Sequence, residues 1–236
     1  MMSIHMSYTR NETAQPAAMP SWKRTLDTAC ILLALPLTLP LAAVIALLIK
    51  LTSRGPVIFR QERVGWGGGR FVCFKFRTMK VNTDERAHWH HVNGLIHSDA
   101  PMTKLDVKGD ERLIPCGAWL RATGLDELPQ LINVWRGEMS LVGPRPCLPY
   151  EYAQYSDWAK GRFQTLPGLT GLWQVNGKNR TTFNEMIRWD LTYAEQRSLG
   201  LDLQIMVRTI PALLWQTAET RLAPRSLPVQ GLQKAA

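Results

Sequence analysis

One long apolar run dominates the first quarter of the chain. Residues 29–51 read ACILLALPLTLPLAAVIALLIKL, with Lys50 as the only charged side chain. As a helix with a rise of ~1.5 Å per residue, this run would be roughly 35 Å long, which is enough to reach through the apolar layer of a membrane. Pro36 and Pro40 lie in its middle, and each removes a backbone donor, so the pattern predicts a bent helix.

Basic residues flank the apolar run on both sides. Lys23 and Arg24 precede it, while Lys50 and Arg54 stand at its other end. Positive flanks stay on the cytoplasmic side of a membrane, so a segment that enters and leaves on that side satisfies both ends. We therefore predict a re-entrant membrane helix over residues 22–51. The alternatives are a bent anchor that spans the membrane and a buried core helix.

A basic hairpin is predicted directly after this helix. Residues 57–64 and 71–78 read as strands, and the glycine cluster at 65–69 reads as the turn between them. Side chains alternate along a strand, so Lys75 and Arg77 share one face. The two cations repel each other, and a bound phosphate would relieve that repulsion. The alternative is a solvated face that meets lipid headgroups.

The remaining pattern is mostly helical. The last apolar stretch, 201–215, is interrupted by Pro211 and suits a short core helix or one lying in the membrane interface. We expect an α+β fold, in which the N-terminal re-entrant membrane helix precedes a helix-rich cytoplasmic catalytic domain, 52–217, with a β-hairpin and interfacial helices. Residues 1–21 and 218–236 lack apolar periodicity, and we expect both to be mobile tails.

Composition narrows the compartment and the type of partner. A chain of 236 residues is long enough for one catalytic domain plus a membrane element. Its net charge of +9 and pI near 9.7 indicate an anionic partner, whether nucleic acid, a phosphorylated small molecule or a lipid surface. The four cysteines have no paired spacing, which argues against a zinc site and a disulfide framework and suits a reducing cytoplasm.

An adjacent pair of acids is the first candidate for chemistry. Asp126 and Glu127 precede Pro129, which suits the first turn of a helix. One interpretation is that both acids cap that helix and complement its dipole. The functional interpretation is that neighbours on a helix point roughly 100° apart, so one carboxylate attacks while the other holds a metal. Mg²⁺ needs little more than one or two carboxylates and substrate phosphates.

Two later segments are candidates for contacts with a ligand. The triplet Pro-Arg-Pro at 144–146 holds Arg145 in a stiff backbone, ready for a phosphate or a base, although a plain surface turn is the alternative. The segment 167–180 is rich in Gly and Asn and reads as a tight loop. Within it, Trp173 and Gln174 are candidates for contacts with a base or sugar, and packing is their alternative role.

Taken together, several blocks in the same order resemble a known family. The blocks are KRTLD at 23–27, GPVIFRQERVG at 55–65, KFRTMK at 75–80, LDELPQLINVWRGEMSLVGPRP at 125–146 and PGLTGLWQVNG at 167–177. They resemble the bacterial sugar transferases, the monotopic phosphoglycosyl transferases that start glycan assembly on a polyprenyl phosphate. The resemblance spans roughly residues 22–215. It favours the functional interpretation of the acidic pair over the capping one.

The resemblance implies a reaction in which Asp126 attacks the β-phosphate of a UDP-sugar and UMP leaves. Polyprenyl phosphate then attacks the phosphosugar-enzyme intermediate, and Glu127 holds Mg²⁺. The implied substrate-binding residues are Lys75, Arg77, Arg121, Pro144, Arg145, Pro146 and, in the shell of the site, Asp190. In the enzymes that the sequence resembles, the re-entrant helix often breaks at a Ser-Pro pair. Here Leu35 precedes Pro36 and a second proline follows, which leaves the position of the bend open.

The same resemblance implies the setting of the protein. It places the protein at the bacterial inner membrane with the catalytic domain on the cytoplasmic face. The expected partners are a UDP-sugar, polyprenyl phosphate and membrane lipid but not nucleic acid, and a homodimer is left open. No spanning helices precede the domain in this sequence, so we expect the small, single-domain form.

Two other functions compete with this one. A metal-dependent glycosyltransferase would move the sugar without its phosphate, and such enzymes commonly carry an Asp-x-Asp triplet, which this chain lacks. A non-enzymatic membrane adaptor would use the basic hairpin to bind anionic lipid. The acidic pair followed by Arg145 argues against the adaptor.

Overall fold

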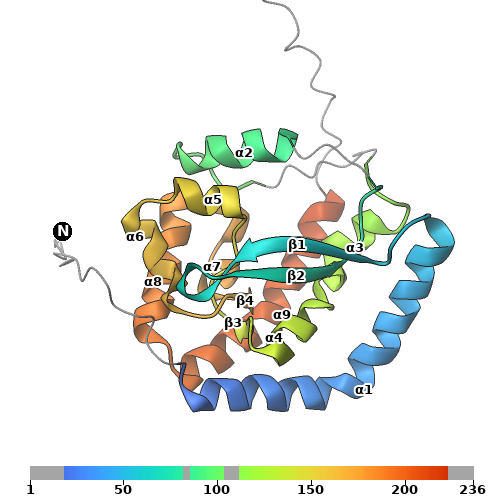
Figure 1. The fold of residues 1–236 in the computed structure, drawn as a ribbon, viewed down its shortest axis with the longest axis horizontal. Helices are drawn as coiled ribbons and strands as arrows, with labels where there is room; N and C mark the ends of the chain where they lie inside the picture. The colour runs from blue at the N-terminus through green and yellow to red at the C-terminus, as the bar shows by residue number, and fades with distance from the viewer. Residues whose placement is uncertain (1–18, 82–85, 104–111, 223–236) are drawn as a thin grey trace, which may run out of the picture.

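The computed structural model describes residues 19–81, 86–103 and 112–222, which form a helix-rich mixed fold with two small sheets (Figure 1). This architecture agrees with the predicted α+β class. The elements, in chain order, are α1 (Ser21–Thr52), β1 (Ile58–Val64), η1 (Trp66–Gly68), β2 (Arg70–Phe76), α2 (Arg86–Ile96), α3 (Gly117–Thr123), η2 (Leu125–Glu127), α4 (Gln130–Arg136), β3 (Ser140–Val142), α5 (Pro149–Gln154), α6 (Asp157–Lys160), η3 (Gly161–Gln164), β4 (Gly168–Thr170), α7 (Leu172–Val175), η4 (Lys178–Arg180), α8 (Phe183–Gln196) and α9 (Leu199–Leu222).

The predicted basic hairpin is present. β1 and β2 pair antiparallel, with Ile58 opposite Phe76, and they cross the middle of the domain in Figure 1. Gly67 and Gly68 have positive φ angles of 62° and 76° in the turn, a region that favours glycine, so the glycine cluster closes the hairpin. The segment expected to be a loop at 167–180 instead contains β4, which pairs parallel with β3, and two short helical turns.

Helix α1 is 32 residues long and bends near its middle, as the two internal prolines predict (Figure 1). Ile31 packs against one side of the domain, and Ile45 and Ile49 pack against another. The large apolar side chains between and beyond these contacts are exposed, namely Leu32, Leu33, Leu35, Leu37, Leu39, Val44, Leu47 and Leu51. Within the described residues, α1 is the one helix long and apolar enough to cross a membrane.

The N-terminal end of α1 is locked into the domain by buried polar contacts. The Lys23 ammonium is fully buried and donates to the carbonyl of Val142 and the hydroxyl of Tyr193. It also forms a 2.6 Å ion pair with Asp202 of α9. One turn later, the carboxylate of Asp27 accepts two hydrogen bonds from β3. These contacts fix α1, β3, α8 and α9 relative to one another.

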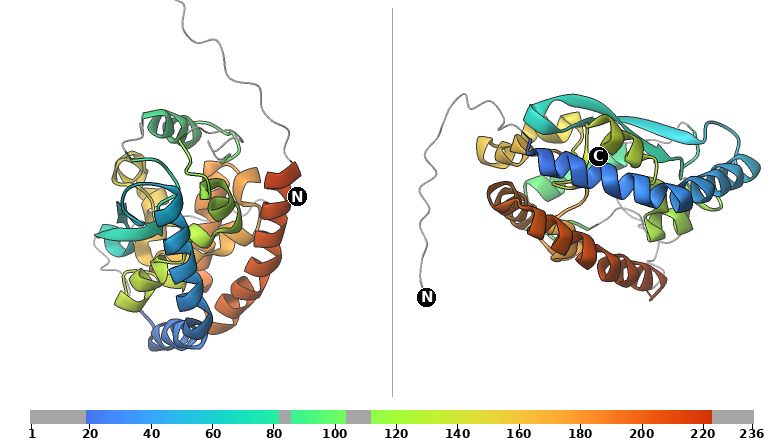
Figure 2. Two further views of the ribbon diagram at one scale, coloured as in Figure 1. Left: turned by 90° about the vertical axis from the view of Figure 1, so that its right-hand side faces the viewer. Right: turned by 90° about the horizontal axis from the view of Figure 1, so that it is seen from below.

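Helix α9 is longer than the sequence predicted. It continues through Pro211 to Leu222 and so includes residues 218–222, which we had expected to be part of the C-terminal tail. Of the expected N-terminal tail, residues 19–21 are described and Ser21 begins α1, while residues 1–18 and 223–236 lie outside the described residues. Figure 2 shows that α1 and α9 start close together and diverge along the same side of the domain. Exposed apolar side chains form one stripe on α9, at Leu203, Val207, Ile210 and Leu214.

Candidate active site

The two adjacent acids lie on a tight turn between two helices. Gly124, with φ of 73°, ends α3 in the left-handed region and starts the turn η2 that carries Asp126 and Glu127. Pro129 is the N-cap of α4, no side chain caps that helix, and neither acid lies in its first turn. The interpretation of the acids as helix caps is therefore wrong, and both side chains line a cavity instead.

Glu127 is held as a carboxylate by two cations from other elements. Its Oε1 lies 2.7 Å from Lys75 Nζ of β2 and 3.5 Å from Arg145 Nη1. Burial opposes ionisation of Glu127, but the positive charges of Lys75 and Arg145 outweigh it and hold the pKa of Glu127 below its usual range. Lys178, which also lines the cavity, adds to the positive charge that acts on this carboxylate.

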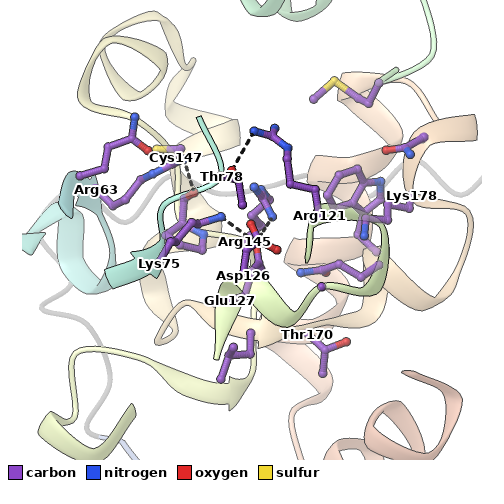
Figure 3. Close-up of a pocket in the computed structure, with 18 of the residues that line it drawn as sticks. Arg63, Lys75, Thr78, Arg121, Asp126, Glu127, Arg145, Cys147, Thr170 and Lys178 are labelled. Carbon is purple, nitrogen blue, oxygen red and sulfur yellow. Dashed lines mark hydrogen bonds and ion pairs between the residues drawn. The ribbon is translucent and has the colours of Figure 1, made fainter. Parts of the chain in front are cut away.

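The cavity in front of this turn has a volume of about 1100 Å³. Figure 3 shows Lys75, Arg121, Asp126, Glu127 and Arg145 converging there from different elements. Arg121 also reaches Thr78, with 3.5 Å between its Nη1 and the threonine Oγ1. A concentration of cations around two carboxylates suits an anionic ligand such as a phosphate.

Arg145 is supported from behind by a buried ion pair. Arg162 donates to the backbone carbonyl of Arg145 at 2.9 Å, and it lies 2.7 Å from Asp190 Oδ2 of α8. Burial raises the pKa of Asp190 to about 6, against the lowering effect of Arg162. Asp190 does not line the cavity, and its contact with Arg162 places it in the layer that supports Arg145.

Lys75 and Arg77 both line the cavity, but they do not form the pair of unbalanced cations that the sequence predicted. The guanidinium of Arg77 is almost fully buried and donates to the Ser53 side chain and to the carbonyls of Ser53, Pro56 and Met79. β2 ends at Phe76, although the backbone N–H of Arg77 still donates to the carbonyl of Val57 at 2.9 Å. Arg77 therefore ties the connection after α1 to the hairpin, and Lys75 is balanced by Glu127.

Of the other expected ligand contacts, the structure brings some to the cavity and not others. Pro146 lines the cavity and Pro144 does not. Trp173 is buried, and its indole N–H donates to Thr181, which is the packing role. The amide of Gln174 is also buried, and neither its oxygen nor its nitrogen has a partner among the described residues. An unsatisfied amide beside a cavity suits a polar ligand group.

Sequence reasoning missed residues that position the site. Asn133 of α4 is fully buried, accepts a hydrogen bond from the backbone N–H of Phe74 and donates to the carbonyl of Val72. It thus fixes the helix that follows the acidic turn against the strand that carries Lys75. The one signal was a polar residue at an otherwise apolar position of LPQLINVW.

Together, a bent apolar helix and a cation-lined cavity with paired carboxylates describe a membrane-associated protein that handles a phosphorylated ligand. The chain belongs to the bacterial sugar transferase family, whose model matches residues 18–216. The exopolysaccharide production protein ExoY of Rhizobium meliloti is 39% identical over 192 residues, which cover 81% of this chain and 84% of that protein.

Two further relatives have more explicit names. The UDP-glucose:undecaprenyl-phosphate glucose-1-phosphate transferase of Caulobacter vibrioides is 41% identical over 201 residues, covering 81% of this chain and 69% of that protein. The undecaprenyl-phosphate galactose phosphotransferase of Salmonella typhimurium is 38% identical over 193 residues. The match covers 81% of this chain but 40% of that longer protein.

Proposed function

We propose that this protein transfers a sugar-1-phosphate from a UDP-sugar to a polyprenyl phosphate and releases UMP. The product would start a lipid-linked glycan, such as an exopolysaccharide, capsule, O-antigen or glycoprotein glycan. The observation that carries the proposal is the acidic turn of Asp126 and Glu127, which faces Lys75, Arg121 and Arg145 across one cavity. The names of the relatives, which include UDP-sugar and undecaprenyl-phosphate transferases, support the same reaction.

The proposed reaction has two displacement steps at one phosphorus atom. The Asp126 carboxylate attacks the β-phosphorus of the UDP-sugar, the bond to the bridging oxygen breaks, and UMP leaves with that oxygen. A phosphate oxygen of the polyprenyl phosphate then attacks the same phosphorus, and the Asp126 carboxylate is regenerated. Each step breaks one P–O bond and forms another, so no oxidant or reductant is needed.

The cations would stabilise charge as it moves between these oxygens. Arg121 and Arg145 present guanidinium groups to the cavity, and the backbone of Arg145 is held by Arg162. Lys75 is positioned to move its ammonium between Glu127 and a phosphate oxygen over a short distance. Charge stabilisation of this type supplies most of the catalysis in phosphoryl transfer.

Glu127 is the residue we propose as the ligand of Mg²⁺. Its carboxylate is kept ionised at the wall of the cavity, and an ionised carboxylate is the kind of oxygen ligand that a hard cation takes. The described residues contain no group of three or more His, Cys, Asp or Glu that could hold a metal alone, so substrate phosphates and water would complete the shell. When bound, the ion supplies positive charge that offsets the negative charge developing on the phosphoryl oxygens.

For the membrane, we propose that α1 enters and leaves on the cytoplasmic side of the inner membrane. Both ends of α1 pack on the same domain, while the leucines of its middle are exposed. The exposed stripe of α9 lies along the same side of the domain and would rest in the interface (Figure 2). The active site would then stand at the height of the lipid phosphates.

The products of one assay separate this function from its rivals. The detergent-solubilised protein is incubated with Mg²⁺, undecaprenyl phosphate and each of a panel of UDP-sugars. We expect UMP and a lipid-linked sugar phosphate with at least one of them, and the responding donor identifies the sugar. Release of UDP would indicate a glycosyltransferase, and the absence of any release across the panel would favour the membrane adaptor.

A further inference from the structure

The cavity extends beyond the charged residues around the acidic turn. Sites for one small molecule usually measure roughly 300–1,000 Å³, and this cavity measures about 1100 Å³. The cations and carboxylates occupy one part of it. Apolar side chains also line it, among them the half-buried Leu128 and Leu131 after the acidic turn, the half-buried Met206 of α9 and Leu213 of α9, which is 38% exposed.

This apolar part adjoins the acidic turn directly. Gly124, the residue that starts the turn, lies against Leu213, because a Cβ at Gly124 would be 3.6 Å from Leu213 Cδ2. One turn earlier on α9, the hydroxyl of Thr209 lies 2.7 Å from that of Thr170, which also lines the cavity. Apolar and charged walls therefore meet within two residues of Asp126.

Helix α9 presents different residues to the cavity and to the outside. Met206 and Leu213 line the cavity, and Leu213 is 38% exposed at its edge, whereas their neighbours Val207 and Leu214 are each 68% exposed, lie outside the cavity and belong to the outer apolar stripe. A ligand that left the cavity at this helix would thus pass from one apolar surface to another. Helix α9, which carries the stripe, starts close to the bent helix α1 and diverges from it on the outside of the domain (Figure 2).

We propose that the apolar part of the cavity, bounded by the residues after the acidic turn and by α9, binds the first isoprene units of the polyprenyl phosphate acceptor. This inference rests on the proposed function. The amphiphilic shape of the acceptor matches the cavity, because its phosphate meets the cations near Asp126 and its chain meets Leu128, Leu131, Met206 and Leu213. The remaining chain leaves the cavity past α9 toward the outer apolar stripe. The donor occupies the charged part.

The test uses adjacent residues of α9 as matched variants in the full chain. Leu213→Gln changes the cavity wall, and Leu214→Gln makes the same change on the outer stripe. Met206→Gln and Val207→Gln form a second such pair one to two turns earlier, in case the first cavity variant does not fold. For each variant, the KM for undecaprenyl phosphate is measured in detergent micelles at a fixed surface concentration of lipid.

We expect Leu213→Gln to raise the KM for undecaprenyl phosphate about tenfold, because a polar group replaces an apolar contact with the chain. Leu214→Gln should leave that KM within about twofold while lowering partition into vesicles. Formation of the labelled protein adduct from the UDP-sugar alone should be unchanged in both. Equal effects on KM at both positions would place the chain on the outer stripe and overturn the proposal.

Two further results would also overturn it. Loss of adduct formation in Leu213→Gln would assign this part of the cavity to the donor. Inhibition of the native protein by dioleoyl phosphatidic acid as strong as that by an unreactive polyprenyl phosphonate would show a site for any acyl chain. If the native protein releases UMP but forms no adduct, the two-step reaction is wrong. The KM comparison then still tests whether the apolar part of the cavity binds the acceptor chain.

Discussion

Two lysine–carboxylate contacts in this protein have nearly the same length and opposite surroundings. Lys75 and Glu127 are 2.7 Å apart, with side chains 17% and 23% exposed at the wall of the cavity. Lys23 and Asp202 are 2.6 Å apart, and neither side chain is exposed at all. A pair that borders a cavity can exchange its partner for a ligand, whereas a sealed pair can only hold its elements together. We infer that the pair at the cavity serves the proposed reaction and that the sealed pair stabilises the fold.

The largest expected effect follows from breaking the pair at the cavity. Glu127→Gln keeps the shape of the side chain but removes the charge that balances Lys75 and Arg145 and that would bind Mg²⁺. We expect kcat for UMP release to fall on the order of a thousandfold with little change in melting temperature. Activity within tenfold of native would mean that this carboxylate takes no part in the reaction.

Breaking the sealed pair should affect stability instead. Lys23→Ala leaves Asp202 buried without its partner, which should lower the free energy of unfolding by about 3–5 kcal/mol. The double variant Lys23→Met with Asp202→Leu replaces both charges by apolar groups and should recover most of this loss. Denaturant unfolding in micelles, followed by tryptophan fluorescence, measures both. Equal destabilisation of the single and double variants would contradict the account of the pair as purely architectural.

The third pair, Arg162 with Asp190, is buried almost as completely as the sealed pair, with side chains 2% and 1% exposed, and it should make stability depend on pH. The pKa of Asp190 is raised from 3.8 to about 6 in the folded protein, so the folded state holds this proton more tightly than the unfolded state. The tighter binding of this proton stabilises the folded state by about 3 kcal/mol. That stabilisation is fully present below about pH 4 and is lost as the pH rises through about 6.

Melting curves between pH 4 and pH 7 check this prediction. The difference in stability between the native protein and Asp190→Asn should change across that interval, because the variant has no carboxyl to titrate. A constant difference at every pH would show that Asp190 titrates at its ordinary value.

An exposed pair gives the smallest expected effect and serves as the reference. Arg70 and Glu62 are 3.2 Å apart on the hairpin, with side chains 64% and 52% exposed. Arg70→Ala should change stability by less than about 0.5 kcal/mol and leave UMP release unaltered. A large loss of activity would mean that the outer face of the hairpin takes part in binding.

The sequence predicted most of the elements that show a regular pattern. The two prolines of α1, the glycine cluster of the hairpin and the alternation up to Lys75 are local features, and the structure agrees with each of them. Arg77 was expected to bind a phosphate together with Lys75, but nearby carbonyls accept hydrogen bonds from its guanidinium instead. Such capture depends on tertiary contacts, which periodicity does not describe.

The long-range polar contacts that hold the fold and position the site were harder to predict, for a physical reason. Lys23 pairs with a residue 179 positions away, and Asp27 accepts from Ser140 at a separation of 113. Asn133 similarly reaches a strand about 60 positions earlier. One sequence identifies these residues as polar at apolar positions, but the partner that makes burial tolerable is visible only after the chain has folded.

The central claim is that Asp126 forms a covalent bond to the phosphosugar. The direct test incubates the protein with a UDP-sugar labelled at the β-phosphate, without a lipid acceptor, and measures the label that stays on the denatured protein. The account predicts label on the native protein and none on Asp126→Asn, since a neutral amide does not attack phosphorus. Label on the Asn variant would place the nucleophile elsewhere, and an unlabelled native protein that still turns over would show that the lipid phosphate attacks the donor directly.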